Sequence, residues 1–206
     1  MTAVKLKTTG IEVGIATREE FEEAVKRDPH LRESLKELGE LEGKRLRETI
    51  LVVARDTASG RVVGHVSRPL PFFGFFSKAR LPPANVFVEE GYRRRGIGQL
   101  LWRTATTGAV AAIDGVSRAR KVKIDAIAGT PEGRKLLEGL GLKPSKAAFA
   151  FFHYEKTEKL PERGREKRAL EREALFRERP ELGKIARAFQ KALMERLPKR
   201  LQRTRR

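Results

Sequence analysis

Cysteine is absent from the 206 residues of this sequence. The chain therefore cannot form a disulfide, use a thiolate nucleophile or build a zinc site from sulfur ligands. The histidines His30, His65 and His153 are too scattered to form a helical pair of ligands, so we expect no metal. The sequence has no apolar run of about 18 residues and no N-terminal signal pattern, which predicts a cytoplasmic protein without membrane contact.

Side-chain amides are also scarce. Asn85 is the single asparagine, and the glutamines are Gln99, Gln190 and Gln202, whereas Glu, Lys and Arg abound. Few thermolabile amides beside many charges are typical of thermophile proteins. A GC-rich codon bias that favours Arg, Ala, Gly and Leu explains the same counts equally well, so both origins stay open.

Negative charge is in short supply: 27 Asp and Glu face 45 Lys and Arg, which leaves a net charge of +18. An excess of this size repels itself unless an anionic partner is present. We therefore expect a nucleic acid, an anionic cofactor or an acidic protein as partner. The length of the chain suits one domain with an appendage.

The apolar pattern predicts an order of strands and helices. The first strand alternates at Ile11, Val13 and Ile15. Thr17 and Glu20 then have the spacing of a capping box, which predicts a helix start. A second helix is expected at the leucines that follow with helical spacing, Leu31, Leu35, Leu38 and Leu41.

Further along, β-branched runs at 48–56 and 60–68 predict a hairpin, and residues 69–83 hold too many prolines for a central strand. Strands are then expected at 84–90, 121–129 and 147–155, and helices at 96–113 and 131–142. The predicted fold class is α/β (α+β), a mixed, mostly antiparallel central sheet flanked by helices. We divide the chain into a domain at 1–155 and a basic helical C-terminal extension at 156–206.

The extension carries 18 Lys and Arg against 8 Asp and Glu, a net charge of +10. Pro161, Pro180 and Pro198 punctuate two expected helices. The second helix has an apolar face formed by Leu182, Ile185, Ala186, Phe189, Leu193 and Leu197. The face predicts docking on the domain and the charge predicts binding to RNA, DNA or the ribosome, and both alternatives remain open.

The most informative segment, residues 86–105, joins a strand end, an arginine-rich turn and a helix that Gly96 and Gly98 open. Amide groups at a helix start, with no side chain at the glycines to block approach, form a cradle for an anion such as a pyrophosphate. Arg93, Arg94 and Arg95 add positive charge around it. Two glycines alone are weak evidence, but the full combination of strand, turn and helix is much stronger.

In this segment the sequence resembles the GNAT superfamily of acyl-CoA-dependent N-acyltransferases. The family motif [QR]-x-x-G-x-[GA] matches Arg93, Gly96 and Gly98, and the resemblance extends over residues 10–155. It implies a GNAT-like fold, acetyl-CoA or another acyl-CoA as co-substrate, and acyl transfer to a primary amine. By position, it implies that the residues that bind the cofactor are Phe87, Val88, Arg93, Arg94, Arg95, Gly96, Ile97, Gly98 and Thr130.

The sequence departs from the family pattern where a catalytic acid is expected. Leu137 stands where family members often place a tyrosine that protonates the departing thiolate, and Leu142 replaces the phenylalanine of a Gly-Phe pair. Thr130 occupies the position of the usual asparagine. The side chains that could act as acid or base are Glu89, Glu90, His65, His153 and Tyr154. Each is also an ordinary surface or core residue, so the catalytic residues stay unassigned.

Two functions remain open. The first is an N-acetyltransferase whose primary amine acceptor could be carried by a macromolecule or a nucleic-acid-associated protein. The second is a non-catalytic binding or structural protein of GNAT fold whose basic tail holds nucleic acid or a nucleoprotein assembly. The arginine-rich turn with its two glycines favours the enzyme, and Leu137 favours the binding protein. An aromatic loop, Phe72, Phe73, Phe75 and Phe76, is expected to line an acceptor groove or to form a lid or dimer contact, and Trp102 is expected in the core.

Overall fold

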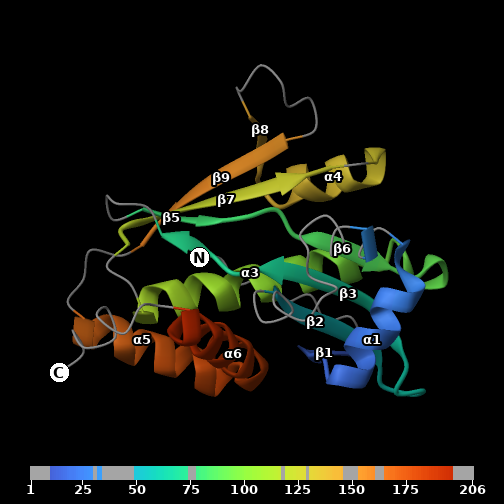
Figure 1. The fold of residues 1–206 in the computed structure, drawn as a ribbon, viewed down its shortest axis with the longest axis horizontal. Coiled ribbons are helices and arrows are strands. Elements are labelled where there is room, and N and C mark those ends of the chain that lie inside the picture. Colours follow the sequence, from blue (N-terminus) through green and yellow to red (C-terminus); the bar gives the residue numbers. More distant parts are fainter. Residues whose placement is uncertain are drawn as a thin grey trace.

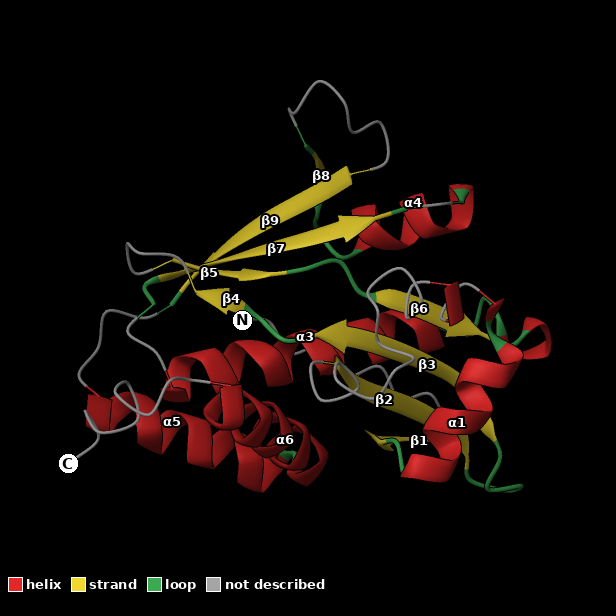
Figure 2. Cartoon of the chain, in the orientation of Figure 1, coloured by secondary structure: helices red, strands yellow, loops and turns green. Residues whose placement is uncertain are grey.

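A computed structural model of the chain describes residues 10–29, 32–33, 49–73, 78–116, 119–128, 130–145, 153–160 and 165–196. Two sheets share one main core, with helices packed on them (Figures 1 and 2). The strands are β1 (Ile11–Ile15), β2 (Thr49–Asp56), β3 (Val62–Pro69), β4 (Phe72–Phe73), β5 (Lys78–Leu81), β6 (Asn85–Val88), β7 (Lys121–Ile127), β8 (Lys143–Pro144) and β9 (His153–Lys159). The predicted fold class is confirmed.

The first sheet has the order β1-β2-β3-β6, and all its pairings are antiparallel. Helix α1 (Arg18–Arg27) follows β1 and begins at the predicted capping box. The Thr17 hydroxyl accepts from the Glu20 amide, and the Glu20 carboxylate accepts from the Thr17 amide. This reciprocal pair satisfies two amide groups that would otherwise lack an acceptor, so the helix start is determined locally.

The second sheet has the order β4-β5-β7-β9-β8, in which only β5 and β7 run parallel. Our prediction that residues 69–83 contain no central strand is wrong for Lys78–Leu81, because β5 lies between β4 and β7. The prolines of this segment stand at positions 69, 71, 82 and 83, outside the four residues of β5. No proline therefore removes a donor from the pairing of β5.

The chain changes sheets between β5 and β6. Residues 82–84 connect the two strands, and β5 pairs with β7 whereas β6 pairs with β3. The two prolines cannot continue a ladder on both sides, which explains why pairing with β7 stops there. The last pair between β5 and β7 is Leu81 with Ile124. Beyond this pair, β6 and β7 diverge (Figure 1).

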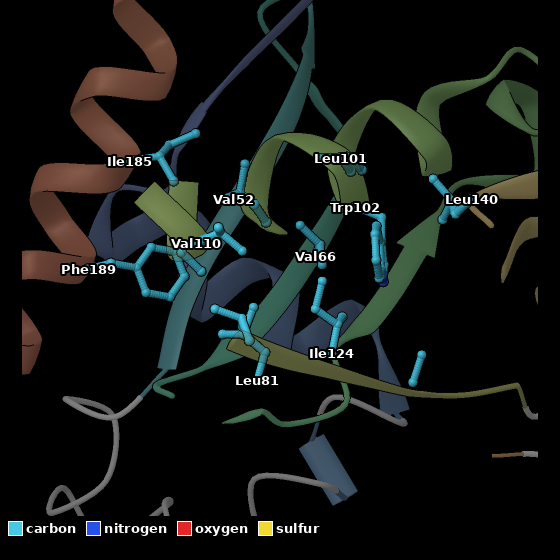
Figure 3. Packing of buried hydrophobic residues seen from close by; sticks show 14 of the residues in the cluster. Val52, Val66, Leu81, Leu101, Trp102, Val110, Ile124, Leu140, Ile185 and Phe189 are labelled. Atoms are coloured by element: carbon cyan, nitrogen blue, oxygen red, sulfur yellow. The ribbon is translucent and has the colours of Figure 1, made fainter. Parts of the chain in front are cut away.

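Helix α3 (Ile97–Val116) packs on the first sheet and has ten buried residues, eight of which belong to the main core. Trp102 is buried, as predicted, and lies near Val66 and Ile124 (Figure 3). Helix α4 (Pro131–Gly139) begins after the Thr130 cap with Pro131 in its first turn. It ends before Gly141, whose φ of 77° favours glycine.

The C-terminal extension forms α5 (Arg165–Glu178) and α6 (Pro180–Arg196), which Figure 1 shows beside α3. Ile185, Phe189 and Leu193 belong to the same core cluster as the sheets. The apolar face of α6 is therefore docked on the domain, as predicted. Strand β9 runs across residue 155, and our division of the chain at that point stays a prediction.

Several predictions fall outside the described residues: most of the leucine helix at 31–41, the loop residues Phe75 and Phe76, the start of the last strand, and Leu197. Within the described parts of the chain, no helix is both long and apolar enough to cross a membrane.

Candidate functional site

The turn between β6 and α3 contains two residues in the left-handed region. A short 3-10 turn (Glu90–Tyr92) leads to Arg94 with φ 62°, and Gly96 has φ 78°. Gly96 adopts this conformation without steric cost, whereas a non-glycine residue there costs on the order of 1–3 kcal/mol. Strain of this kind concentrates where backbone groups must point in a defined direction, and here it precedes the first turn of α3 directly.

The first amides of α3 belong to Ile97, Gly98 and Gln99, and a helix offers such amides no internal acceptor. A Cβ at Gly98 would lie 3.7–3.8 Å from the side chains of Val86, Val88 and Leu136, which is ordinary contact. Packing within the chain therefore does not require glycine at this position. The missing side chain leaves room for an anion to approach the helix start.

The predicted arginines surround this turn and are exposed. Arg93 donates from Nε to the Val88 carbonyl at 3.0 Å. The Arg95 guanidinium lies 5.1 Å from the centre of the Tyr92 ring. The hydrogen bond from the Tyr92 hydroxyl to Asp56 raises the pKa of Tyr92, so this ring stays neutral beside the arginines.

The backbone of β6 has one side turned toward β3 and one side turned away. Glu89 donates its amide to the Val63 carbonyl, and Phe87 pairs with His65. In an antiparallel pair such bonded positions alternate, so the polar groups of Phe87 face β3 and those of Val86 and Val88 face the diverging side. Of the two residues that the sequence offered for a pantetheine contact, Val88 has the suitable orientation.

A small, open pocket lies on the face of the first sheet that α1 covers, between α1 and β6. Its lining includes His65, Phe87 and Ala24, with Glu20, Glu23 and Glu89. These carboxylates are paired with arginines. Glu89 contacts Arg27 at 3.2 Å and Arg61 at 2.5 Å, so its carboxylate is held in two ion pairs.

A buried polar cluster stands at the side of this pocket. His65 Nε2 lies 3.1 Å from Asp28 Oδ2, and the Asn85 amide donates to the same oxygen at 3.3 Å. The His65 ring stacks on Phe87 at 5.3 Å. Sequence reasoning named His65 but missed Asp28, because Asp28 is the C-cap of α1 and lies 37 residues away in sequence.

The remaining candidates lie elsewhere. His153 Nε2 is 3.4 Å from Asp125 on the second sheet, and the Tyr154 hydroxyl donates to Glu138. Burial and Glu138 raise the pKa of Tyr154, which keeps its proton at neutral pH. Leu137 is buried in the core, and the Thr130 hydroxyl accepts from the Gly133 amide as the cap of α4.

No protein-family profile and no curated protein matches this chain. Among solved structures, Arabidopsis thaliana NAA60 in complex with acetyl-CoA aligns with a TM-score of 0.50 at 15% identity, over 73% of this chain and 98% of that one. NAA60 in complex with a bisubstrate analogue aligns with the same score and identity, over 71% and 97%. A GNAT-family acetyltransferase from Staphylococcus aureus reaches 0.49 at 14% identity, over 71% and 98%. The chain has the fold of the GNAT acetyltransferases, as its resemblance to them predicted.

Proposed function

We propose that the protein is an acyl-CoA-dependent N-acyltransferase that acts on a primary amine. The observation that carries this proposal is the turn at residues 93–98. It joins three arginines and a glycine-containing helix start, and it follows β6, the strand that diverges from β7. An anion gains both from the unpaired amides and from the helix dipole at such a point.

The co-substrate would bind along β6. Its pyrophosphate would contact the amides of residues 94–98, with Arg93, Arg94 and Arg95 supplying charge. Its pantetheine arm would pair with the outward backbone groups of Val88 and Val86. Arg93 now donates to the Val88 carbonyl, so this contact would be exchanged for one with the ligand. Thr130 would contribute a contact only if its hydroxyl kept the cap of α4 at the same time.

The reaction forms a C–N bond as the amine attacks the thioester carbonyl, and the C–S bond breaks. We propose that the amine enters from the pocket beside α1, where His65 accepts its proton and Asp28 positions the ring. The departing thiolate needs a proton, which Leu137 cannot donate. A thiol has an ordinary pKa of about 8.5, so the thiolate can take a proton from water, and the missing acid slows the reaction without preventing it.

The alternative, a GNAT-fold protein that binds nucleic acid without catalysis, is favoured by one observation. Leu137 is packed in the core and cannot donate a proton, so this position supplies no acid for the departing thiolate. The same protein could still bind acyl-CoA, which makes turnover the measurement that separates the two functions.

Calorimetry with acetyl-CoA on the full chain tests the binding step. Gly98→Asp should abolish the heat, because it places a carboxylate where the pyrophosphate lies. Gly98→Ala is the matched control: its methyl group meets only ordinary contacts within the chain, so it should keep the fold, and because it adds no charge it should weaken the binding less than Gly98→Asp does. Wild-type protein that binds no acyl-CoA at millimolar concentration would exclude the proposal.

Release of free CoA thiol in the presence of peptide amines and polyamines tests the chemistry. We expect His65→Gln to lower kcat with little change in the affinity for acyl-CoA, because glutamine cannot accept the proton of the amine. A His65→Gln variant with wild-type kcat would exclude His65 as the base and leave the binding proposal intact.

A further inference from the structure

Arg68 on β3 is the largest side chain that is fully buried in the described part of the protein. It points toward α3, where Nη2 donates to the Thr106 hydroxyl at 2.7 Å, and Nη1 donates to the Pro82 carbonyl at 3.1 Å. Pro82 is the residue at which the chain leaves β5 and its pairing with β7. The guanidinium therefore sits at the inner end of the diverging strands.

Among the residues that the structure describes, no carboxylate forms an ion pair with this buried cation. Both of its hydrogen-bond partners are neutral, and burial alone lowers the pKa of Arg68, to about 9, so the group still carries its charge at neutral pH. A buried arginine is normally paired with an acid, because an unpaired charge in the interior is strongly destabilising. The folded chain gains little from Arg68 that an apolar side chain would not supply.

Two donors without acceptors belong to neighbouring side chains. Arg68 Nε and Trp102 Nε1 are two of the three buried side-chain N or O atoms without a hydrogen-bond partner among the described residues. The guanidinium carbon lies 5.2 Å from the centre of the Trp102 ring. Buried N–H groups without acceptors are rare, and two neighbouring ones can serve the two oxygens of one carboxylate.

The position of these donors relates to the proposed acyl-CoA site. Val88, beside the turn at residues 93–98, is six residues from Pro82, and β6 supplies four residues of this stretch, which spans at most about 20 Å when fully extended. An extended pantetheine arm together with a short acyl group spans a comparable length. A co-substrate whose pyrophosphate lies at the start of α3 would therefore place its thioester beside Asn85 and the pair of His65 and Asp28, and the far end of its acyl group near Pro82 and Arg68.

We propose that Arg68 and Trp102 bind the terminal carboxylate of a dicarboxylic acyl group, so that the preferred donor is an acyl-CoA of the succinyl class. The inference rests on the proposed function and specifies its substrate. The carboxylate would accept from Arg68 Nε and Trp102 Nε1 and neutralise the buried charge. It takes no part in the transfer itself, in which only the thioester bond breaks.

Calorimetry with succinyl-CoA and butyryl-CoA, which differ chiefly in the terminal carboxylate, tests the inference on the full chain. We expect wild-type protein to bind succinyl-CoA about 10- to 100-fold more tightly, as a charge-assisted contact predicts. Arg68→Met should remove the preference, retain butyryl-CoA binding and unfold at no lower temperature than wild type. Trp102→Phe keeps an aromatic ring without the donor and should reduce the preference, which keeps the test valid if Arg68→Met does not fold.

The outcomes separate this inference from the function on which it rests. Equal affinity for the two ligands, or a preference that survives both substitutions, would overturn the carboxylate site and leave the acyltransferase proposal standing. Absence of binding by either ligand would overturn both. Gly98→Asp serves as the control that loses both ligands together.

Discussion

In this basic chain, one carboxylate can accept hydrogen bonds from several cations or amides. Glu20 accepts from Arg55 through both carboxylate oxygens, at 2.6 and 2.7 Å, and also from the Thr17 amide. It thereby joins the first turn of α1 to β2. The hydrogen bond from Arg55 lowers the pKa of Glu20 below its ordinary value of 4.5.

This shift predicts how acid acts on the fold. A carboxyl with a lowered folded-state pKa stabilises the protein at pH values above 4.5, and the stabilisation is lost as the pH falls through the folded-state pKa. Glu20→Gln should therefore lower Tm at pH 7 and have a diminishing effect below pH 4.5 in thermal melts. Glu22→Gln is the control, because the exposed pair with Arg18 contributes about 0.3–0.5 kcal/mol at most. A Tm loss that is equal at both pH values would contradict the assignment.

At the scale of elements, α3 is the helix on which the site and the core both depend. One side packs on the first sheet, and the other side meets α6. Two glycines of α3 lie at the contact with α6. A Cβ at Gly108 would lie 2.5 Å from Ile185 Cγ2, whereas a Cβ at Gly115 would lie 2.3 Å from Gln190 Nε2.

These glycines make a matched pair of substitutions. Ile185 is fully buried and cannot move, so Gly108→Ala should lower the free energy of unfolding by about 1–2 kcal/mol once the gain in helix propensity is subtracted. The end of Gln190 can swing aside, so Gly115→Ala should be neutral or raise stability by up to about 1 kcal/mol. Urea unfolding measures both. Equal effects of the two substitutions would mean that α3 and α6 are packed less closely than described.

Element boundaries were predictable where one short stretch of chain supplies all the interacting groups. The capping box of Thr17 and Glu20, the helix that begins at Pro131, and the two C-terminal helices were all inferred from their own residues. Strand β5 was not, because its four residues have little pattern of their own and are held by β4 and β7. Of the candidate site, the glycine turn was inferred and the buried partners Asp28 and Arg68 were missed.

The packing of the whole molecule determines which of the excess basic residues are exposed to solvent. On α6 the apolar face is buried, while Lys184, Arg187 and Lys191 are exposed. On α5, Arg172 contacts Asp114 at 3.5 Å, so part of the positive charge of the extension is paired with a carboxylate of the fold. The exposed lysines and arginine of α6 are the cations that a polyanion can reach without disturbing the core.

We expect Lys184→Gln, Arg187→Gln and Lys191→Gln combined to weaken binding to duplex DNA of any sequence. Each phosphate contact contributes about −0.9 to the slope of log K against log salt, so the slope should become shallower by up to about 3. Titrations at several salt concentrations measure this, with Tm as the control for folding. An unchanged slope would exclude this face of α6 as a nucleic-acid surface.

Removal of the extension should affect folding before it affects binding. A chain that ends after residue 160 loses Ile185, Phe189 and Leu193 from the core. Truncation of one such aromatic residue alone costs about 3–5 kcal/mol, against a typical total of about 5–15 kcal/mol. We expect this fragment to lose cooperative unfolding in circular dichroism melts. A fragment that melts cooperatively would instead support the predicted division into a domain and an extension.

The sequence by itself determined the features that act over a few residues: the caps, the periodicity of the helices, the glycine turn with its arginines, and the large positive charge. The tertiary structure alone decided which distant residues meet. His65 and Asp28 are 37 positions apart, and Arg68 and Thr106 are 38 positions apart. Such contacts exist only after the sheets have formed and the helices have packed on them, and a buried side chain owes its partners, or their absence, to that packing and not to its neighbours in sequence.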